Sequence, residues 1–195
     1  MARRTRSTRS KAPSRRAASR TVTFGVACSL DNFIARPDHS VDWLKWTKDV
    51  SAITSQYWKT IDTVVMGRKS YDIARNASGE AYRGVKCYVF SRTLPPARHG
   101  STEILADDPA GFVRQLKSQP GKCICVMGGG ELARELFEAD LIDEVGLNIQ
   151  PVLLGSGIPL FHALPRQIDL ELIECREISG GCVYVMYRVK RGKLE

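Results

Sequence analysis

Short apolar runs rich in β-branched and aromatic residues recur along the chain, and such runs predict strands. They cover residues 22–28, 63–66, 87–90, 104–105, 123–127 and 145–149. The run at 123–127 is apolar on both faces, as in a parallel strand that helices cover on either side. Two longer runs, 170–178 and 182–189, flank Ser179-Gly180-Gly181, and this arrangement predicts an antiparallel hairpin.

Apolar residues at helical spacing lie between the strand runs. The stretch 43–59 lacks Pro and Gly and places apolar residues near helical spacing, so we predict a helix over it. Further helices are predicted over residues 68–73, 109–120 and 131–139. Asp107 or Asp108 would cap the helix that Pro109 opens. The alternation of strands and helices predicts an α/β protein with a mostly parallel sheet and an antiparallel C-terminal edge.

The formal net charge of +8 comes from the first twenty residues. Eight of the 29 basic residues lie there without any acid, which leaves 21 basic against 21 acidic residues in the rest of the chain. Because this Arg- and Ser-rich segment has no apolar run, we predict a disordered basic tail over residues 1–20 and one domain over residues 21–191. The tail fits a transit peptide, a basic arm for nucleic acid or anionic surfaces, or an extension from an upstream start codon. The domain itself is neutral, so we expect it to have no nucleic-acid partner.

Six cysteines lie mostly within the apolar runs, at positions 28, 87, 123, 125, 175 and 182. No second Cys pair and no nearby His completes a metal tetrad, so we expect buried free thiols in a reducing compartment and no metal. No stretch approaches the ~20 apolar residues that span a membrane. We therefore expect a cytoplasmic protein without a membrane partner.

Two glycine-marked turns carry the candidate chemistry. An apolar strand runs into glycine and then into a helix at 66–70, Met-Gly-Arg-Lys-Ser, and at 127–130, Met-Gly-Gly-Gly. Glycine lets a phosphate approach the backbone, and the free N–H groups and dipole of the helix start favour its negative charge. A third strand end, Ser91-Arg92, offers a hydroxyl and a guanidinium that suit a ribose 2′-phosphate.

A glycine after a strand usually reflects turn chemistry alone. Three strand ends with matching anion chemistry instead favour one shared ligand, because ligands of open α/β sheets gather at the carboxyl ends of the strands. Residues 128–133 also fit a relaxed G-x-G-x-x-A pattern. That pattern comes late in the chain and no acidic residue ends the next strand, which disfavours a standard Rossmann domain.

Five segments stand in a recognisable order, at residues 29–35, 65–71, 89–92, 127–132 and 143–161. Together they resemble the dihydrofolate reductase superfamily, and more closely the reductase domain of the bifunctional riboflavin-biosynthesis deaminase/reductase and its stand-alone relatives. The resemblance covers about residues 21–190. It implies a dihydrofolate reductase-like three-layer α/β/α fold, an NADPH-dependent oxidoreductase and a homodimer.

The resemblance also implies the residues that bind NADPH. The backbone of Ala27 and Ile34 would face the nicotinamide. The adenosine 2′-phosphate side would be held by Gly67, Arg68, Lys69, Ser70, Ser91 and Arg92. The pyrophosphate would be held by Met127, Gly128, Gly129, Gly130, Glu131 and Leu132. Asp31, Trp43 and Met127 match positions near the substrate.

Two departures from the resembled families bear on the substrate. The riboflavin reductases usually carry a glutamate where this chain has Met127, and the zinc-deaminase half is absent. Asp42 and Asp49 are the only candidates for the carboxylate with which dihydrofolate reductases bind the pterin, and neither fits the usual spacing. Asp31 is either a catalytic proton relay and substrate anchor or a turn residue.

We therefore expect hydride transfer to a small pyrimidine- or pteridine-like heterocycle, as in 5-amino-6-(5-phosphoribosylamino)uracil reductase. The alternatives are true dihydrofolate reductase activity and a catalytically silent protein that binds NADPH or another ligand.

Overall fold

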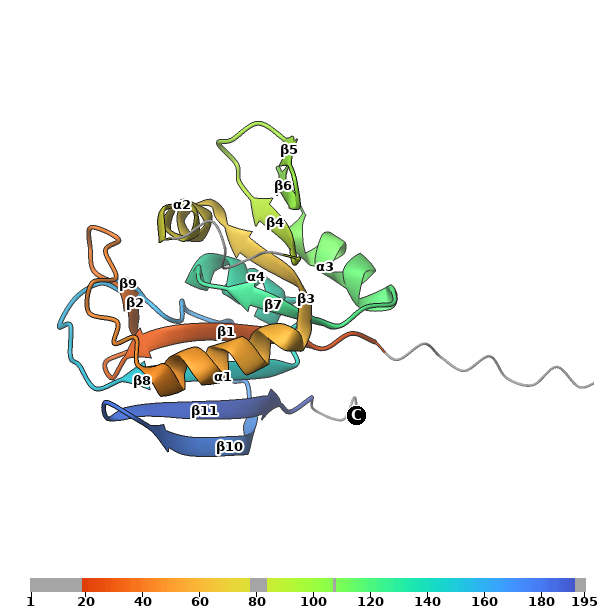
Figure 1. The fold of residues 1–195 in the computed structure, drawn as a ribbon. Coiled ribbons are helices and arrows are strands. Elements are labelled where there is room, and N and C mark those ends of the chain that lie inside the picture. The colour runs from red at the N-terminus through yellow and green to blue at the C-terminus, as the bar shows by residue number, and fades with distance from the viewer. Residues whose placement is uncertain (1–18, 78–83, 107, 192–195) are drawn as a thin grey trace, which may run out of the picture.

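The computed structural model describes residues 19–77, 84–106 and 108–191, and a large twisted sheet runs through this part of the chain (Figure 1). Its nine strands, in spatial order, are β10 (Leu170–Ile178), β11 (Cys182–Val189), β8 (Glu144–Gln150), β1 (Val22–Ser29), β7 (Cys123–Met127), β3 (Ile61–Gly67), β4 (Lys86–Phe90), β6 (Thr102–Leu105) and β5 (Ala97–His99). The six strands from β8 to β6 run parallel to one another, whereas β10 and β11 at one edge and β5 at the other pair antiparallel. The predicted mostly parallel sheet with its C-terminal hairpin is confirmed.

In the described part of the chain, four helices cover the two faces of the sheet. Helices α1 (Lys48–Lys59) and α2 (Arg68–Ala77) lie on one face, and α3 (Pro109–Ser118) and α4 (Gly130–Glu138) lie on the other (Figure 1). The larger core cluster joins the sheet to α3 and α4 through Val113, Leu116, Leu136 and Phe137. A second cluster packs the opposite face of β3, β4 and β7 against aromatic side chains of α1 and α2. These layers confirm the predicted three-layer α/β/α arrangement.

Helix α1 begins later than the apolar spacing predicted. Thr47 caps the helix by accepting a hydrogen bond from the backbone N–H of Val50 at 3.2 Å, so residues 43–46 lie outside it. Trp43 is buried in the turn before the helix, while Trp46 is exposed. The apolar residues of this segment therefore reflect a packed turn as well as a helix face.

Asp108 caps α3 as predicted, with its carboxylate accepting from the backbone N–H of Gly111 at 2.8 Å, and Asp107 lies outside the described residues. Three short strands were not predicted. β5 has three residues, and β2 (Phe33–Ala35) pairs with β9 (Ile158–Pro159) in a separate small sheet. Segments this short carry too few residues to show an alternating pattern.

The folded domain begins before the predicted boundary. The side chain of Arg20 is 5% exposed, forms an ion pair with Asp62 and donates to Thr63 Oγ1 at 2.8 Å. Arg20 therefore belongs to the folded domain and not to the predicted tail. Residues 1–18 lie outside the described part of the chain. No helix in the described ranges has the length and apolar character needed to cross a membrane.

The expectation of buried thiols holds for most of the cysteines. Cys28, Cys87, Cys125 and Cys182 are buried, and Cys123 is half-buried. Burial raises the pKa of Cys28, Cys87 and Cys125 to about 11, which suppresses their reactivity. Cys175 corrects the expectation, because it is exposed on the edge strand β10.

Candidate cofactor and active site

The sheet brings the three predicted strand ends together. Strands β7, β3 and β4 are neighbours, with Met127 level with Met66 and Gly67 level with Phe90. The turns that begin at Gly128, Gly67 and Ser91 therefore follow one another along one edge. β1 lies beyond β7 and continues past this edge to Ser29. The shared edge predicted from the sequence is present.

The two glycine turns contact each other. Gly128 has a φ of +58°, and a Cβ there would collide with the hydroxyl of Ser70 on α2. Gly130 is also closely packed, since a Cβ there would collide with the ring of His162. Gly67 differs from both, because no contacting atom of the described residues lies within 4 Å of the position that its Cβ would take. The backbone is thus closely packed at Gly128 and open at Gly67.

Two helices begin at this edge, and α2 has the start that better suits an anion, because α4 carries Glu131 in its first turn. Helix α4 is capped by Gly129, whose backbone is left-handed and which supplies no side-chain hydrogen bond. Helix α2 has no acid in its first turn and instead begins with Arg68 and Lys69. Two cations at the positive end of a helix dipole repel it, and a bound anion would offset this repulsion.

The basic side chains at the edge are accessible. Arg68 forms a half-exposed pair with Asp72 at 3.4 Å, and Lys69 is exposed. Arg92 is 87% exposed and lies 3.7 Å from Glu131 at the start of α4. Such exposed pairs are weak, so a phosphate can replace the carboxylate at little cost in free energy.

Ser91 has a different role from the one predicted for its hydroxyl. It is buried, and its Oγ accepts hydrogen bonds from the backbone N–H groups of Thr93 at 3.2 Å and Leu94 at 2.9 Å. The hydroxyl therefore holds the turn that presents Arg92. This local pattern, in which Ser bonds to the backbone two or three residues on, is common in turns.

A row of side chains lies on the α1 face of the sheet, next to the glycine turns. Ala27 on β1 is level with Asn148 on β8, and Asn148 is level with Tyr184 on β11. Met127 lies on the neighbouring strand β7, level with Gly25 and so two residues below Ala27. Ala27 and Met127 are half-buried, so this part of the sheet is only partly covered.

Asn148 is a polar residue that the sequence analysis did not single out. Its Oδ1 is buried and meets no hydrogen-bond partner among the described residues, and the same is true of Nε1 of the buried Trp43. The segment after Trp43 is fixed to β8, since Lys45 donates its backbone N–H to Gln150 Oε1 at 3.0 Å. The signal in the sequence is a single Asn in the otherwise apolar run 145–149.

Asp31 anchors a loop. Its carboxylate accepts from the Ser29 hydroxyl at 2.6 Å and from the backbone N–H groups of Leu154 at 3.1 Å and Gly155 at 2.7 Å. These contacts tie the turn after β1 to the segment that precedes β9, and they favour the turn role over the catalytic one. The half-buried Ile34, on β2, packs against the larger core beside this anchor.

The other two candidate carboxylates, those of Asp42 and Asp49, also bind other groups of the protein. Asp42 forms an exposed ion pair with Arg36 at 2.7 Å. Asp49, in the first turn of α1, accepts from the backbone N–H of Ser179 at 3.3 Å. Asp49 thus links α1 to the turn of the C-terminal hairpin, and Asp42 belongs to the surface turn before α1.

Asp31 is expected to lack a catalytic proton at neutral pH. The hydrogen bond from Ser29, followed by those from Gly155 and Leu154, lowers the pKa of its carboxyl. A lowered folded pKa means that the carboxylate stabilises the fold above the unfolded value of about 3.9, and that this contribution is lost as pH falls through the folded pKa. We predict that Asp31→Asn increases amide hydrogen exchange at Leu154 and Gly155. The pH–rate profile of Asp31→Asn above pH 5 should have the same shape as that of the wild type. If the variant lost an inflection that the wild type shows above pH 5, the anchor role would be contradicted.

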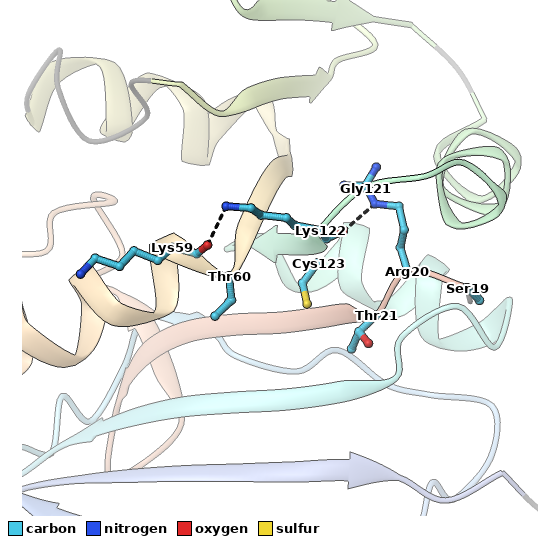
Figure 2. Close-up of a pocket in the computed structure, with 8 residues that line it drawn as sticks. All are labelled: Ser19, Arg20, Thr21, Lys59, Thr60, Gly121, Lys122 and Cys123. Carbon is cyan, nitrogen blue, oxygen red and sulfur yellow. Dashed lines mark hydrogen bonds between the residues drawn. The ribbon is translucent and has the colours of Figure 1, made fainter. Parts of the chain in front are cut away.

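A hollow lies at the other end of the sheet. It measures about 440 Å³ and is formed where β1, β3 and β7 begin (Figure 2). Figure 2 shows Lys122 reaching the backbone carbonyl of Lys59, at 2.9 Å, and Arg20 reaching that of Lys122, at 2.6 Å. Arg20 and Lys122 are already bound to the protein here, so this hollow is a poorer match to phosphate than the glycine edge.

Comparisons with known proteins agree with this architecture. The RibD C-terminal domain family matches residues 20–184. YwjB of Bacillus subtilis (strain 168), an uncharacterised protein, is 34% identical over 170 residues, which span 86% of this chain and 97% of YwjB. The resemblance noted from the five sequence motifs is confirmed.

Two solved structures show the same fold. A protein from Shewanella sp. PV-4, described as a candidate riboflavin biosynthesis protein, superposes with a TM-score of 0.73 at 23% identity and covers 88% of this chain and 99% of its own. Dihydrofolate reductase from Enterococcus faecalis, in complex with NADP(H), gives a TM-score of 0.64 at 13% identity over 88% of this chain and 97% of its own. From the extent of the family match and the identity with YwjB, the chain belongs to the RibD C-terminal domain family.

Proposed function

We propose that this protein is an NADPH-dependent reductase that transfers a hydride to a small pyrimidine- or pteridine-like heterocycle. One observation carries the proposal: three neighbouring strand ends present two helix starts and two accessible arginines along a single edge. Family membership supports a reductase, and the Enterococcus faecalis neighbour is a reductase in complex with NADP(H). The riboflavin-type reaction on 5-amino-6-(5-phosphoribosylamino)uracil is the closest chemical precedent.

Different residues of this edge would bind different parts of the cofactor. Arg68, Lys69 and Arg92 would bind the 2′-phosphate, and the backbone N–H groups of residues 130–132 would bind the pyrophosphate. The cofactor supplies the hydride when bound, and the chain supplies orientation. Ala27 lies beside the pyrophosphate turn on the α1 face, where its backbone would meet the nicotinamide.

The substrate would lie on the α1 face beyond Met127. Met127 places an apolar side chain where the riboflavin reductases usually have a carboxylate, so the pocket favours an uncharged ring edge at this position. We propose that the amide of Asn148 and the indole N–H of Trp43 hydrogen-bond the substrate, because each has a buried polar atom for which the described part of the chain supplies no partner. A ring that carries an N–H beside a carbonyl offers the matching donor and acceptor.

Turnover tests the proposal directly. Purified protein is mixed with NADPH and a panel of pyrimidine and pteridine substrates, and the absorbance of NADPH is followed together with product analysis. We expect oxidation with at least one ring that carries an N–H beside a carbonyl. Asn148→Leu should reduce kcat/KM about tenfold or more without altering the affinity for NADPH, since an unmade hydrogen bond costs ~1–3 kcal/mol. NADPH binding without turnover on the whole panel would favour the silent binding protein.

The two glycine turns predict opposite outcomes for the same substitution. Gly128→Ala should destabilise the protein by about 1–3 kcal/mol, because it combines a left-handed backbone with a collision against Ser70. Gly67→Ala should leave the free energy of unfolding nearly unchanged, because its Cβ meets open space. The same Cβ would block a phosphate, so we expect Gly67→Ala to lower NADPH affinity. Urea unfolding and calorimetric titration measure the two effects, and unchanged NADPH affinity in Gly67→Ala would contradict the proposed contact.

A further inference from the structure

The proposed hydride transfer also requires a proton. When a hydride adds to the carbon of a C=N or C=O bond, the bonding electron pair moves to the heteroatom, which must then be protonated. Asp31, Asp42 and Asp49 are bound to other groups of the protein. The amide of Asn148 and the indole of Trp43 offer hydrogen bonds but do not release a proton at neutral pH. The donor therefore has to be sought among the other polar groups of the α1 face.

The hydroxyl of Tyr57 is a polar group on this face that packing does not explain. Tyr57 lies on α1, and its ring packs against the core cluster formed by β3, β4 and β7. Its hydroxyl is buried and meets no partner in full hydrogen-bond geometry within the described ranges. Phenylalanine would fill the same space without leaving a buried hydroxyl unpaired, which is unfavourable. The hydroxyl is therefore available to a ligand.

Two adjacent glycines let this hydroxyl reach the sheet at the level of the proposed substrate. Gly25 on β1 is level with Gly146 on β8 and with Met127 on β7. A Cβ at Gly25 would lie 3.1 Å from the Tyr57 hydroxyl, and a Cβ at Gly146 would lie 3.0 Å from the terminal methyl of Met186. Glycine within a strand often marks such a close approach. The Tyr57 hydroxyl thus lies at the level of Met127, beyond which the substrate is proposed to bind.

A buried threonine connects this region to a carboxylate at the surface. Thr23, two residues before Gly25 on the same face of β1, is 2% exposed and donates from Oγ1 to Glu144 Oε2 at 3.3 Å. Glu144 is partly exposed, so it can exchange protons with solvent. Burial raises the pKa of Tyr57 and the neighbouring Cys125 raises it further, whereas the Thr23 hydroxyl lowers it. The phenol therefore keeps its proton at neutral pH, with Thr23 beside it.

Two other neighbours of the Tyr57 hydroxyl are poorer routes for a proton. Cys125 is 1% exposed, and burial raises the pKa of its thiol to about 11. Tyr184, on β11, also has its pKa raised by burial. Groups with raised pKa values exchange protons slowly at neutral pH, so among these described neighbours the path through Thr23 to Glu144 is the better one.

We propose, in a step that rests on the proposed function, that the Tyr57 hydroxyl donates the proton that accompanies hydride transfer and that Thr23 and Glu144 replace it. The substrate carbon takes the hydride from NADPH, and the electron pair of the C=N or C=O bond moves to the heteroatom. The heteroatom takes the proton of Tyr57, and the phenolate takes the proton of Thr23. Thr23 is reprotonated by Glu144, which draws a proton from solvent. NADPH, the substrate and one proton thus give NADP⁺ and the reduced substrate.

Tyr57→Phe tests the proton donor. With the substrate that the turnover panel identifies, its kcat should fall about a hundredfold or more, since a general acid contributes ~10²–10⁴-fold. The KM for that substrate and the dissociation constant of NADPH should change little. Tyr88→Phe is the matched control and should retain the kcat of the wild type, because Tyr88 packs against Phe112 of α3 on the opposite face of the sheet.

The two other groups of the path are tested in the same assay. Thr23→Val and Glu144→Gln should each lower kcat. Combining either of them with Tyr57→Phe should not lower kcat below that of Tyr57→Phe alone, because all three groups act on one proton. Full additivity would contradict a shared path.

Two measurements that do not depend on turnover complete the test. Urea unfolding should show Tyr57→Phe to be at least as stable as the wild type, since the hydroxyl removed has no partner in the part of the chain that the structure describes. In protein labelled with carbon-13 at the hydroxyl-bearing carbon of tyrosine, one NMR signal is lost in Tyr57→Phe. That signal should shift when uracil, a ring with an N–H beside a carbonyl, is added together with NADP⁺.

The outcomes distinguish this proposal from the proposed function. NADPH binding without turnover on the whole panel contradicts the reductase function, and the proton donor with it. If the wild type turns over and Tyr57→Phe retains its kcat, or loses activity only through KM, the proton donor is overturned while the reductase function stands. A Tyr57 signal that uracil does not shift overturns the contact with the substrate.

Discussion

Replacing Arg68 and Arg92 together by alanine is expected to abolish most of the preference for NADPH over NADH. In the proposed complex each guanidinium would make charge-assisted hydrogen bonds to the 2′-phosphate, which are worth about 1.5–3 kcal/mol. The two cofactors differ by the 2′-phosphate, so the loss falls on NADPH alone. We expect its dissociation constant to rise about a hundredfold, while that of NADH changes little. Calorimetric titration of both cofactors measures the two constants.

Arg166→Ala is the control for this experiment. Arg166 is also half-exposed and paired with a carboxylate, Asp140, but Asp140 follows the carboxyl end of α4 rather than its start. This variant should retain the preference of the wild type. Equal affinity of the wild type for NADPH and NADH would contradict the assignment of the two arginines to a 2′-phosphate.

Replacement of Arg20 by methionine is expected to destabilise the protein by about 3 kcal/mol. Its side chain is almost fully buried, and its loss would remove the ion pair with Asp62 and leave the hydroxyl of Thr63 and the carbonyl of Lys122 without this donor. Removing one partner of a buried pair costs ~3–5 kcal/mol, and the lower end applies because Asp62 is 37% exposed. Urea unfolding followed by circular dichroism measures the change.

Two truncations distinguish the stabilising effect of Arg20 from any effect of the basic residues that precede it. Removal of residues 2–18 should leave the free energy of unfolding unchanged, whereas removal of residues 2–20 should destabilise the protein as Arg20→Met does. If both truncations unfold at the same urea concentration as the full chain, Arg20 does not stabilise the domain.

The sequence predicted those features that depend on neighbouring residues. A glycine between an apolar strand and a helix is a local pattern, so the turns at Gly67 and Gly128 could be located before the structure was known. Their meeting along one edge followed from the general behaviour of parallel sheets. The hairpin around Ser179–Gly181 was likewise found with its correct strands, because turn and strand signals agree there.

Roles that depend on distant contacts could not be predicted. Asp31 is bound by the backbone N–H groups of Leu154 and Gly155, more than 120 positions away. Asn148 stands out only when β8 is placed between β1 and β11, which leaves its amide oxygen buried with no hydrogen-bond partner in the ranges that the structure describes. Arg20 resembled the arginines before it until its pairing with Asp62 was seen.

The location of the bound cofactor tests the account most directly. Hydrogen exchange of the wild-type protein is measured by mass spectrometry with and without saturating NADPH. We predict protection of backbone amides at residues 67–70, 92–94 and 128–133, at the carboxyl ends of β3, β4 and β7. Protection confined to the hollow around Thr21, Thr60 and Lys122, or no protection at the glycine edge, would contradict the account.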